Sequence, residues 1–189
     1  MNTKKILNNK GVTLIEIMMV LAISAALLVI AGFSLSLING ANTYKAASSL
    51  KSVFSKAKTQ SMAKGNTNGQ LTIKRLSSGT AVVMGSSTGV DDMIAGRRVE
   101  SYYYFGTGDY DGATKSSKPI ENLAAFNKLT ADVEIQYNSA GMVTSVQMGG
   151  VDYKNDIYVY EFAFKSGKRV DAVVLYPVSG KAETLMWFE

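Results

Sequence analysis

The sequence predicts an α+β protein in which one long amino-terminal helix precedes an antiparallel β-sheet domain. Two observations predict this class. No proline interrupts residues 12–64, which are apolar at first and then apolar only at helical spacing. Residues 66–189 instead contain short alternating runs separated by glycine turns. We expect the second half of the helix to pack on the sheet and its first half to span a membrane.

The composition excludes several kinds of protein. A chain of 189 residues with 47% apolar and 19% charged side chains suits one folded domain with an attached segment. The chain has no cysteine and no histidine, which excludes disulfide frameworks, the usual zinc sites and catalysis by a thiol or an imidazole. We therefore predict that the chain is not an enzyme and that it binds no cofactor and no metal.

The first eleven residues form a separate basic segment. They contain Lys4, Lys5 and Lys10 and no acid. Because these lysines account for three of the five net positive charges, the rest of the chain is close to neutral, which gives little support to a nucleic-acid partner. Residues 1–11 are predicted to be a leader peptide that is cleaved.

Residues 12–38 are predicted to be the membrane-spanning and assembly half of the helix. Glu16 is their only charged residue. At about 1.5 Å per residue, the uncharged part from Ile17 to Ile38 spans the roughly 30 Å hydrocarbon layer. The lysines before this run place the amino terminus in the cytoplasm, so the remainder of the chain is expected to be exported.

Residues 39–65 are predicted to be the amphipathic half of the same helix. Apolar and small side chains recur there at intervals of three and four residues, at Tyr44, Ala47, Leu50, Phe54, Ala57 and Ser61. The lysines of this segment mostly lie off that stripe, and Gly65 supplies a stop signal. The stripe is expected to face the sheet.

Residues 66–189 are predicted to be an exported β-rich head. The strand-like runs are residues 70–76, 80–84, 99–105, 132–137, 143–148, 157–164, 170–176 and 183–188. Glycine turns follow Ser139, Ser166 and Ser179, so the later runs are expected to pair as hairpins. We expect one antiparallel sheet, with residues 85–96 as a connection.

Residues 10–23 read KGVTLIEIMMVLAI: glycine after a basic leader, an apolar residue, threonine, leucine, a glutamate five residues after the glycine, and a long apolar run. This string resembles the amino-terminal segment of type IV pilins and of type II secretion pseudopilins. The resemblance implies that a prepilin peptidase recognises the leader with Lys4, Lys5 and Lys10, cuts between Gly11 and Val12, and methylates Val12.

The head resembles GspH/FimT-type minor pilins and minor pseudopilins in its order of helix, early strand, central hairpin with Gly141 and two glycine-turned hairpins near the end. The resemblance implies a structural subunit of a type IV pilus or a type II secretion-like filament. Its implied partners are the prepilin peptidase, other pilin or pseudopilin subunits, and the inner or cytoplasmic membrane before assembly. Its final location would be a cell-surface or periplasmic filament.

Glu16 is the residue for which the membrane prediction demands an explanation. A carboxylate in hydrocarbon costs about 2.5 kcal/mol or more, although an interfacial position would lower this cost. Cleavage would create an amine on Val12, about 6 Å from Glu16 along a helix axis. We expect this amine to pair with Glu16 of a neighbouring subunit, a head-to-tail contact that generates a filament. Glu16 and Thr13 are therefore the predicted assembly residues.

A second hypothesis is a membrane-anchored extracellular binding module for DNA or adhesion. Aromatic and basic side chains could form a stacking surface for single-stranded DNA, namely Arg97, Arg98, Tyr102, Tyr104, Lys168 and Arg169. The interpretation we adopt is that the rings fill the two faces of the sheet and that the cations are solvated. DNA is thus an alternative partner and not the expected one.

Asp109 and Asp111 lie in a short glycine-flanked segment that resembles part of a calcium loop. A calcium site needs several further oxygen ligands at fixed spacing, and the later acids of the standard loop are missing here. We therefore interpret this segment as a polar turn.

Overall fold

The computed structural model describes residues 13–64, 69–85, 90–111, 116–153 and 158–189. Side chains are described throughout these ranges except at 31–39, 109–111, 116 and 117. By its internal contacts the chain divides into two compact units, residues 1–38 and residues 39–189. The α+β class is confirmed: one long helix precedes antiparallel sheets.

The helix is α1 (Leu14–Lys64), and the strands form two larger sheets and one hairpin. The first sheet has the order β10-β9-β8-β1-β2-β3, with β1 (Gln70–Leu76), β2 (Gly79–Met84), β3 (Asp92–Gly96), β8 (Val133–Tyr137), β9 (Val143–Met148) and β10 (Val151–Asp152). The second has the order β13-β12-β11-β4-β7, with β4 (Glu100–Gly106), β7 (Asn127–Lys128), β11 (Val159–Ser166), β12 (Arg169–Tyr176) and β13 (Lys181–Phe188). The hairpin pairs β5 (Asp109–Asp111) with β6 (Ser116–Lys118), and a short 3-10 helix, η2, spans Leu123–Ala125.

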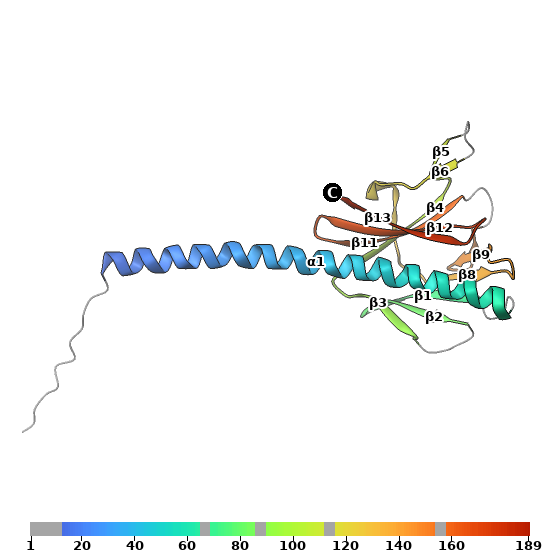
Figure 1. The fold of residues 1–189 in the computed structure, drawn as a ribbon, viewed down its shortest axis with the longest axis horizontal. Coiled ribbons are helices and arrows are strands. Elements are labelled where there is room, and N and C mark those ends of the chain that lie inside the picture. Colours follow the sequence, from blue (N-terminus) through green and yellow to red (C-terminus); the bar gives the residue numbers. More distant parts are fainter. Residues whose placement is uncertain (1–12, 65–68, 86–89, 112–115, 154–157) are drawn as a thin grey trace, which may run out of the picture. The chain divides into compact units, whose positions relative to one another are not determined.

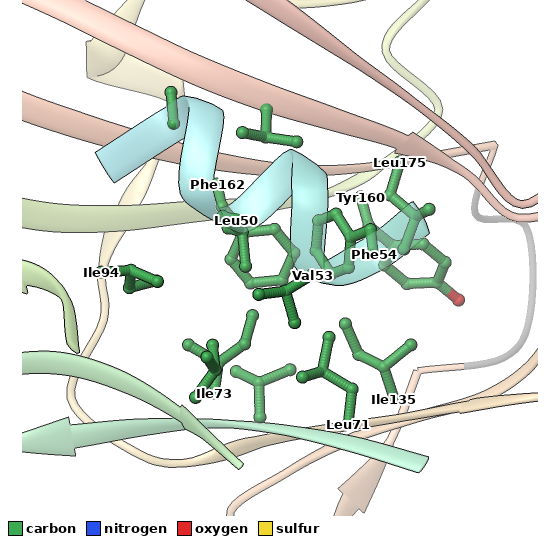
Figure 2. Packing of buried hydrophobic residues seen from close by; sticks show 14 of the residues in the cluster. Leu50, Val53, Phe54, Leu71, Ile73, Ile94, Ile135, Tyr160, Phe162 and Leu175 are labelled. Carbon is green, nitrogen blue, oxygen red and sulfur yellow. The ribbon is translucent and has the colours of Figure 1, made fainter. Parts of the chain in front are cut away.

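The second half of α1 lies between the two larger sheets, as Figure 1 shows. Leu50, Val53 and Phe54 of the helix share one core with side chains of both sheets (Figure 2). On one side this core includes Ile73 and Ile135, and on the other it includes Phe162, whose ring centroid lies 5.8 Å from that of Phe54. The helix is therefore covered on two sides rather than one.

The expected single sheet is thus two sheets. Residues 85–96, predicted to be a connection, contain β3. The chain passes from the first sheet to the second between β3 and β4, returns between β7 and β8, and passes to the second again between β10 and β11. Both sheets share one core with the buried apolar residues of the helix, which are Ala46, Ala47, Leu50, Val53, Phe54 and Ala57.

One residue of the predicted helix stripe is wrong. Tyr44 is 58% exposed, whereas its neighbour Thr43 is fully buried. The Thr43 hydroxyl donates to Oδ2 of the buried Asp171 at 2.5 Å. Arg169 donates to both carboxylate oxygens of Asp171, at 2.7 and 2.9 Å. This polar contact joins the helix to β12 and explains why a threonine, not the tyrosine, faces inward.

The carboxyl-terminal part of α1 is held by two turns. Ser61 Oγ lies 2.9 Å from the carbonyl oxygen of Tyr137 and 2.6 Å from that of Asn138, and Lys58 donates to the carbonyl of Ser179 at 2.7 Å. The turns themselves touch, because a Cβ on Gly180 would lie 1.9 Å from the carbonyl oxygen of Gly141. Glycine is therefore required at Gly180 by space as well as by its positive φ of 58°.

A second, smaller core covers the other face of the second sheet. It contains Leu123, within η2, and Phe126, directly after η2, and both pack with Ala163 and Trp187. Glu161 lies on the same strand as Ala163 and is completely buried. Its Oε1 accepts the backbone N–H of Ile120 at 3.0 Å, and burial raises the pKa of this carboxyl group to about 7.

Candidate functional site

Thr13 and Glu16 form a reciprocal cap at the start of α1. Glu16 Oε2 accepts the backbone N–H of Thr13 at 2.8 Å and its hydroxyl at 2.9 Å. The Thr13 hydroxyl in turn accepts the N–H of Glu16 at 3.3 Å. This is a capping box, in which two of the unpaired N–H groups of a helix start are satisfied by side chains. Glu16 thus has a local structural role in addition to the predicted assembly role.

The expected distance between Glu16 and the amine of Val12 stays a prediction. The value of about 6 Å along the helix axis assumes that Val12 is helical. The helix begins at Leu14, and the Glu16 side chain folds back to the backbone of Thr13, the neighbour of Val12. Val12 itself lies outside the described residues.

The large apolar side chains that follow this cap, up to Ile30, are exposed all around the helix. Exposed fractions of the large apolar residues between Leu14 and Ile30 extend from 48% for Ile17 to 76% for Leu14. A helix that is apolar on every side is normally surrounded by lipid or by other protein. Within the part of the chain that the structure describes, however, no helix is both long enough and apolar enough to qualify as a membrane span.

The predicted processing residues are not among those described. Lys4, Lys5, Lys10, Gly11 and Val12 all fall in residues 1–12. Their assignment as leader and cleavage site therefore remains a prediction from the sequence.

The residues of the predicted stacking surface occupy separate places. Arg97 and Arg98 line a pocket with residues of α1 at the β3–β4 turn. Tyr102 and Tyr104 instead pack against the smaller core, where Tyr104 lies 5.7 Å from Phe126 between ring centroids. The hydroxyl of Tyr102 donates to Oε2 of Glu100 at 2.9 Å.

Lys168 and Arg169 belong to the β11–β12 hairpin. Lys168 is exposed, and its backbone carbonyl accepts the N–H of Glu189. The Arg169 guanidinium is paired with Asp171 and packs over Gly40. Arg169 is thus paired with a carboxylate, where we expected a solvated cation, and Tyr102 and Tyr104 are half-buried on β4.

Asp109 and Asp111 lie in strand β5, although their side chains are not described. No group of three or more acidic residues placed to hold a metal ion occurs among the described residues. The backbone of Asp109–Asp111 is an extended strand, so the predicted turn is wrong for these residues.

Sequence reasoning missed three features of this molecule. The capping box was readable, because threonine followed three residues later by glutamate before an apolar run is its standard pattern. The contact of Thr43 with Asp171 joins residues distant in the sequence, and the burial of Glu161 depends on a segment that crosses the second sheet. Neither of these two had a local signal.

Comparison with protein families matches residues 6–32 to the prokaryotic N-terminal methylation motif. The chain therefore has a prepilin-type amino-terminal segment, of the kind found on membrane-anchored precursors of exported structural subunits. The match covers part of the predicted leader, the capping box and the exposed apolar part of α1. Comparisons of the chain with curated proteins and with solved structures found no significant match.

Proposed function

We propose that this protein is a minor pilin or pseudopilin: a membrane precursor that a prepilin peptidase processes and that then joins a type IV pilus or a type II secretion-like filament. The observation that supports this most strongly is the methylation motif at residues 6–32. The motif coincides with a helix whose apolar side chains are exposed from Leu14 to Ile30. A GspH/FimT-type subunit is the closer identity that we propose.

In this proposal residues 1–11 are the leader and are recognised through Lys4, Lys5 and Lys10. The peptidase cuts between Gly11 and Val12 and methylates the new amine of Val12. A glycine at Gly11 lets the scissile backbone lie close to the enzyme because it has no side chain. Residues 12–38 anchor the precursor in the cytoplasmic membrane with its amino terminus inside and residues 66–189 exported.

Assembly is proposed to use the charge of Glu16. In the single chain both bonds from Thr13 go to Oε2 of Glu16. No described residue of the chain donates to Oε1, which leaves this oxygen for a donor from outside. The methylated amine of Val12 on an adjacent subunit is a cation suited to that position, and in an apolar bundle the attraction between the two charges offsets their desolvation. Repetition of this head-to-tail contact would extend a filament.

The first test is the amino-terminal residue and intact mass of the protein extracted from membranes or sheared filaments. The proposal predicts a chain that begins with N-methylated Val12 and keeps its apolar helix. An unprocessed Met1, or a chain beginning beyond Ile38, would contradict it. Gly11→Val should accumulate the longer form, which gel mobility distinguishes from the processed one.

A pair of variants separates assembly from capping. Glu16→Gln removes the charge but retains a side chain that can close a capping box, whereas Thr13→Ala removes the cap hydroxyl and retains the charge. We expect Glu16→Gln to block incorporation into filaments and Thr13→Ala to permit it, with both variants exported and cleaved. The reverse result would assign Glu16 to capping alone. Normal incorporation of both would favour an anchored binding module.

A further inference from the structure

A pocket of about 370 Å³ lies within the unit of residues 39–189, between α1 and the β3–β4 turn. The helix contributes Asn42 and Lys45, and the turn contributes Arg97 and Arg98. Met93, on β3, is partly exposed beside them. These five residues define what we call the basic pocket.

The three cations of the basic pocket have no anionic partner among the described residues. The ion pairs of the described chain use other cations, such as Lys128 with Glu100 and Arg169 with Asp171. No acidic residue is among the described residues that line the pocket. Three positive charges gathered in one concave site repel one another, and an anion bound between them would relieve that repulsion. The guanidinium groups of Arg97 and Arg98 are suited to the oxygens of a phosphate group.

The position of the pocket along the chain indicates the source of that phosphate. Asn42 and Lys45 follow Ile38, the end of the proposed membrane segment, by about 6 and about 10 Å of helix. The chain itself therefore keeps the pocket within reach of lipid headgroups. No aromatic ring lines the described pocket, whereas sites for single-stranded nucleic acid combine cations with exposed rings.

We propose that the basic pocket binds the phosphate of an anionic glycerophospholipid while the protein is anchored in the membrane, before assembly. This inference rests on the membrane anchoring in the proposed function. Lys45, Arg97 and Arg98 provide the charge, and the Asn42 amide can donate to a glycerol or phosphate oxygen. Transfer into a filament would then require release of this lipid.

The test uses the full chain in nanodiscs of phosphatidylcholine alone or mixed with phosphatidylglycerol. Because the chain has no cysteine, Met93→Cys provides a single site for a spin label at the pocket. Collision of the label with a nickel-chelating lipid reports its contact with the membrane surface. We expect collisions to be several-fold more frequent in the discs that contain phosphatidylglycerol.

Two matched double variants identify the residues responsible. Arg97→Gln with Arg98→Gln should remove the dependence on phosphatidylglycerol, since neutralising two cations weakens binding to an anionic surface roughly tenfold or more. Lys56→Gln with Lys118→Gln removes the same charge from exposed positions outside the pocket and should leave the dependence intact. Equal loss in both pairs would show general charge attraction and overturn the proposal.

Competitors distinguish other anions from a lipid. If inorganic phosphate at modest concentration abolishes the extra collisions in the discs that contain phosphatidylglycerol, the lipid assignment is overturned in favour of free phosphate. A single-stranded oligonucleotide that binds through Arg97 and Arg98, with no difference between the two kinds of disc, would overturn it in favour of nucleic acid. Failure of the chain to enter discs would contradict the proposed function as well, whereas entry without lipid dependence would contradict the basic pocket alone.

Discussion

Glu161 is a carboxylic acid in the middle of β11 with no exposure to solvent. One oxygen accepts the N–H of Ile120, but the buried Oε2 has no hydrogen-bond partner among the described residues. Desolvation of the charged form, and to a smaller degree the nearby charge of Glu121, raises the pKa of Glu161 to about 7. The folded state therefore retains a proton that the unfolded chain releases near pH 4.5.

This difference predicts how stability depends on pH. Because the folded chain binds more protons than the unfolded chain between about pH 4.5 and about pH 7, the contribution of Glu161 to stability falls as the pH rises through that interval. The free energy of unfolding of Glu161→Gln should thus equal that of the wild type near pH 4.5 and exceed it by up to about 3 kcal/mol above pH 7. Urea unfolding in detergent across this range measures the difference.

The exposed Glu134 on β8 offers the matched control. Glu134→Gln should follow the wild-type profile at every pH, because this side chain stays in solvent. A constant difference between Glu161→Gln and the wild type across the range would contradict a buried, proton-retaining Glu161.

Asp171 is the second residue whose burial has a measurable consequence. It accepts bonds from Thr43 and Arg169, so Asp171→Ala would leave a partly buried guanidinium without this acceptor. It would also remove one acceptor of the buried Thr43 hydroxyl, which donates to the carbonyl of Gly40 as well. We expect the free energy of unfolding to fall by about 3 kcal/mol. The exposed pair of Lys181 and Glu183 is the control, and Glu183→Ala should change stability by less than about 1 kcal/mol. Similar losses in both variants would show that Asp171 is not a special contact.

At the scale of elements, the turn between β12 and β13 depends on a close approach. Gly180→Ala would place a methyl group against the carbonyl of Gly141 at a positive φ, which we expect to destabilise the protein by about 3 kcal/mol. Gly150→Ala is matched in φ, at 82°, but meets nothing within 4 Å. It should cost only about 1 kcal/mol. Thermal unfolding compares the two, and equal costs would mean that the contact with Gly141 is unimportant.

The elements differ in how far the sequence predicted them. β1 and β9 begin and end where their alternation predicted, and the hairpin of β11 and β12 has the expected glycine turn. β3 was missed because it follows Asp91 and itself ends in Gly96, and both residue types are signals of a connection. Tyr44 was predicted to face inward, but the buried residue is its neighbour Thr43, because a helical stripe defines a face only to within one residue.

At the scale of the whole molecule, each residue of the two hydrophobic cores lies in the unit of residues 39–189. A fragment of residues 39–189 should therefore fold without the apolar segment and unfold cooperatively, with a midpoint close to that of the full chain in detergent. Circular dichroism during urea titration measures both. An unfolded fragment, or one without a cooperative transition, would show that residues 13–38 contribute to the core.

The candidate sites also differ in what made them predictable. Gly11, Val12 and Glu16 belong to one short segment, and their proposed roles depend only on neighbours in the sequence, so a linear motif sufficed to suggest them. The basic pocket combines Lys45 with Arg97 and Arg98, which are separated by a helix end and three strands. No linear pattern could have joined these residues.

The sequence alone determined the long helix, its change from uniformly apolar to amphipathic, and the prepilin-type segment, because these depend on the spacing of residues along one element. The tertiary structure alone decided that two sheets cover the helix, that Asp171 receives Thr43 and Arg169, and that Glu161 is buried. The reason is that burial and pairing depend on which segments, distant in the sequence, pack together. Local sequence preferences are compatible with many such arrangements.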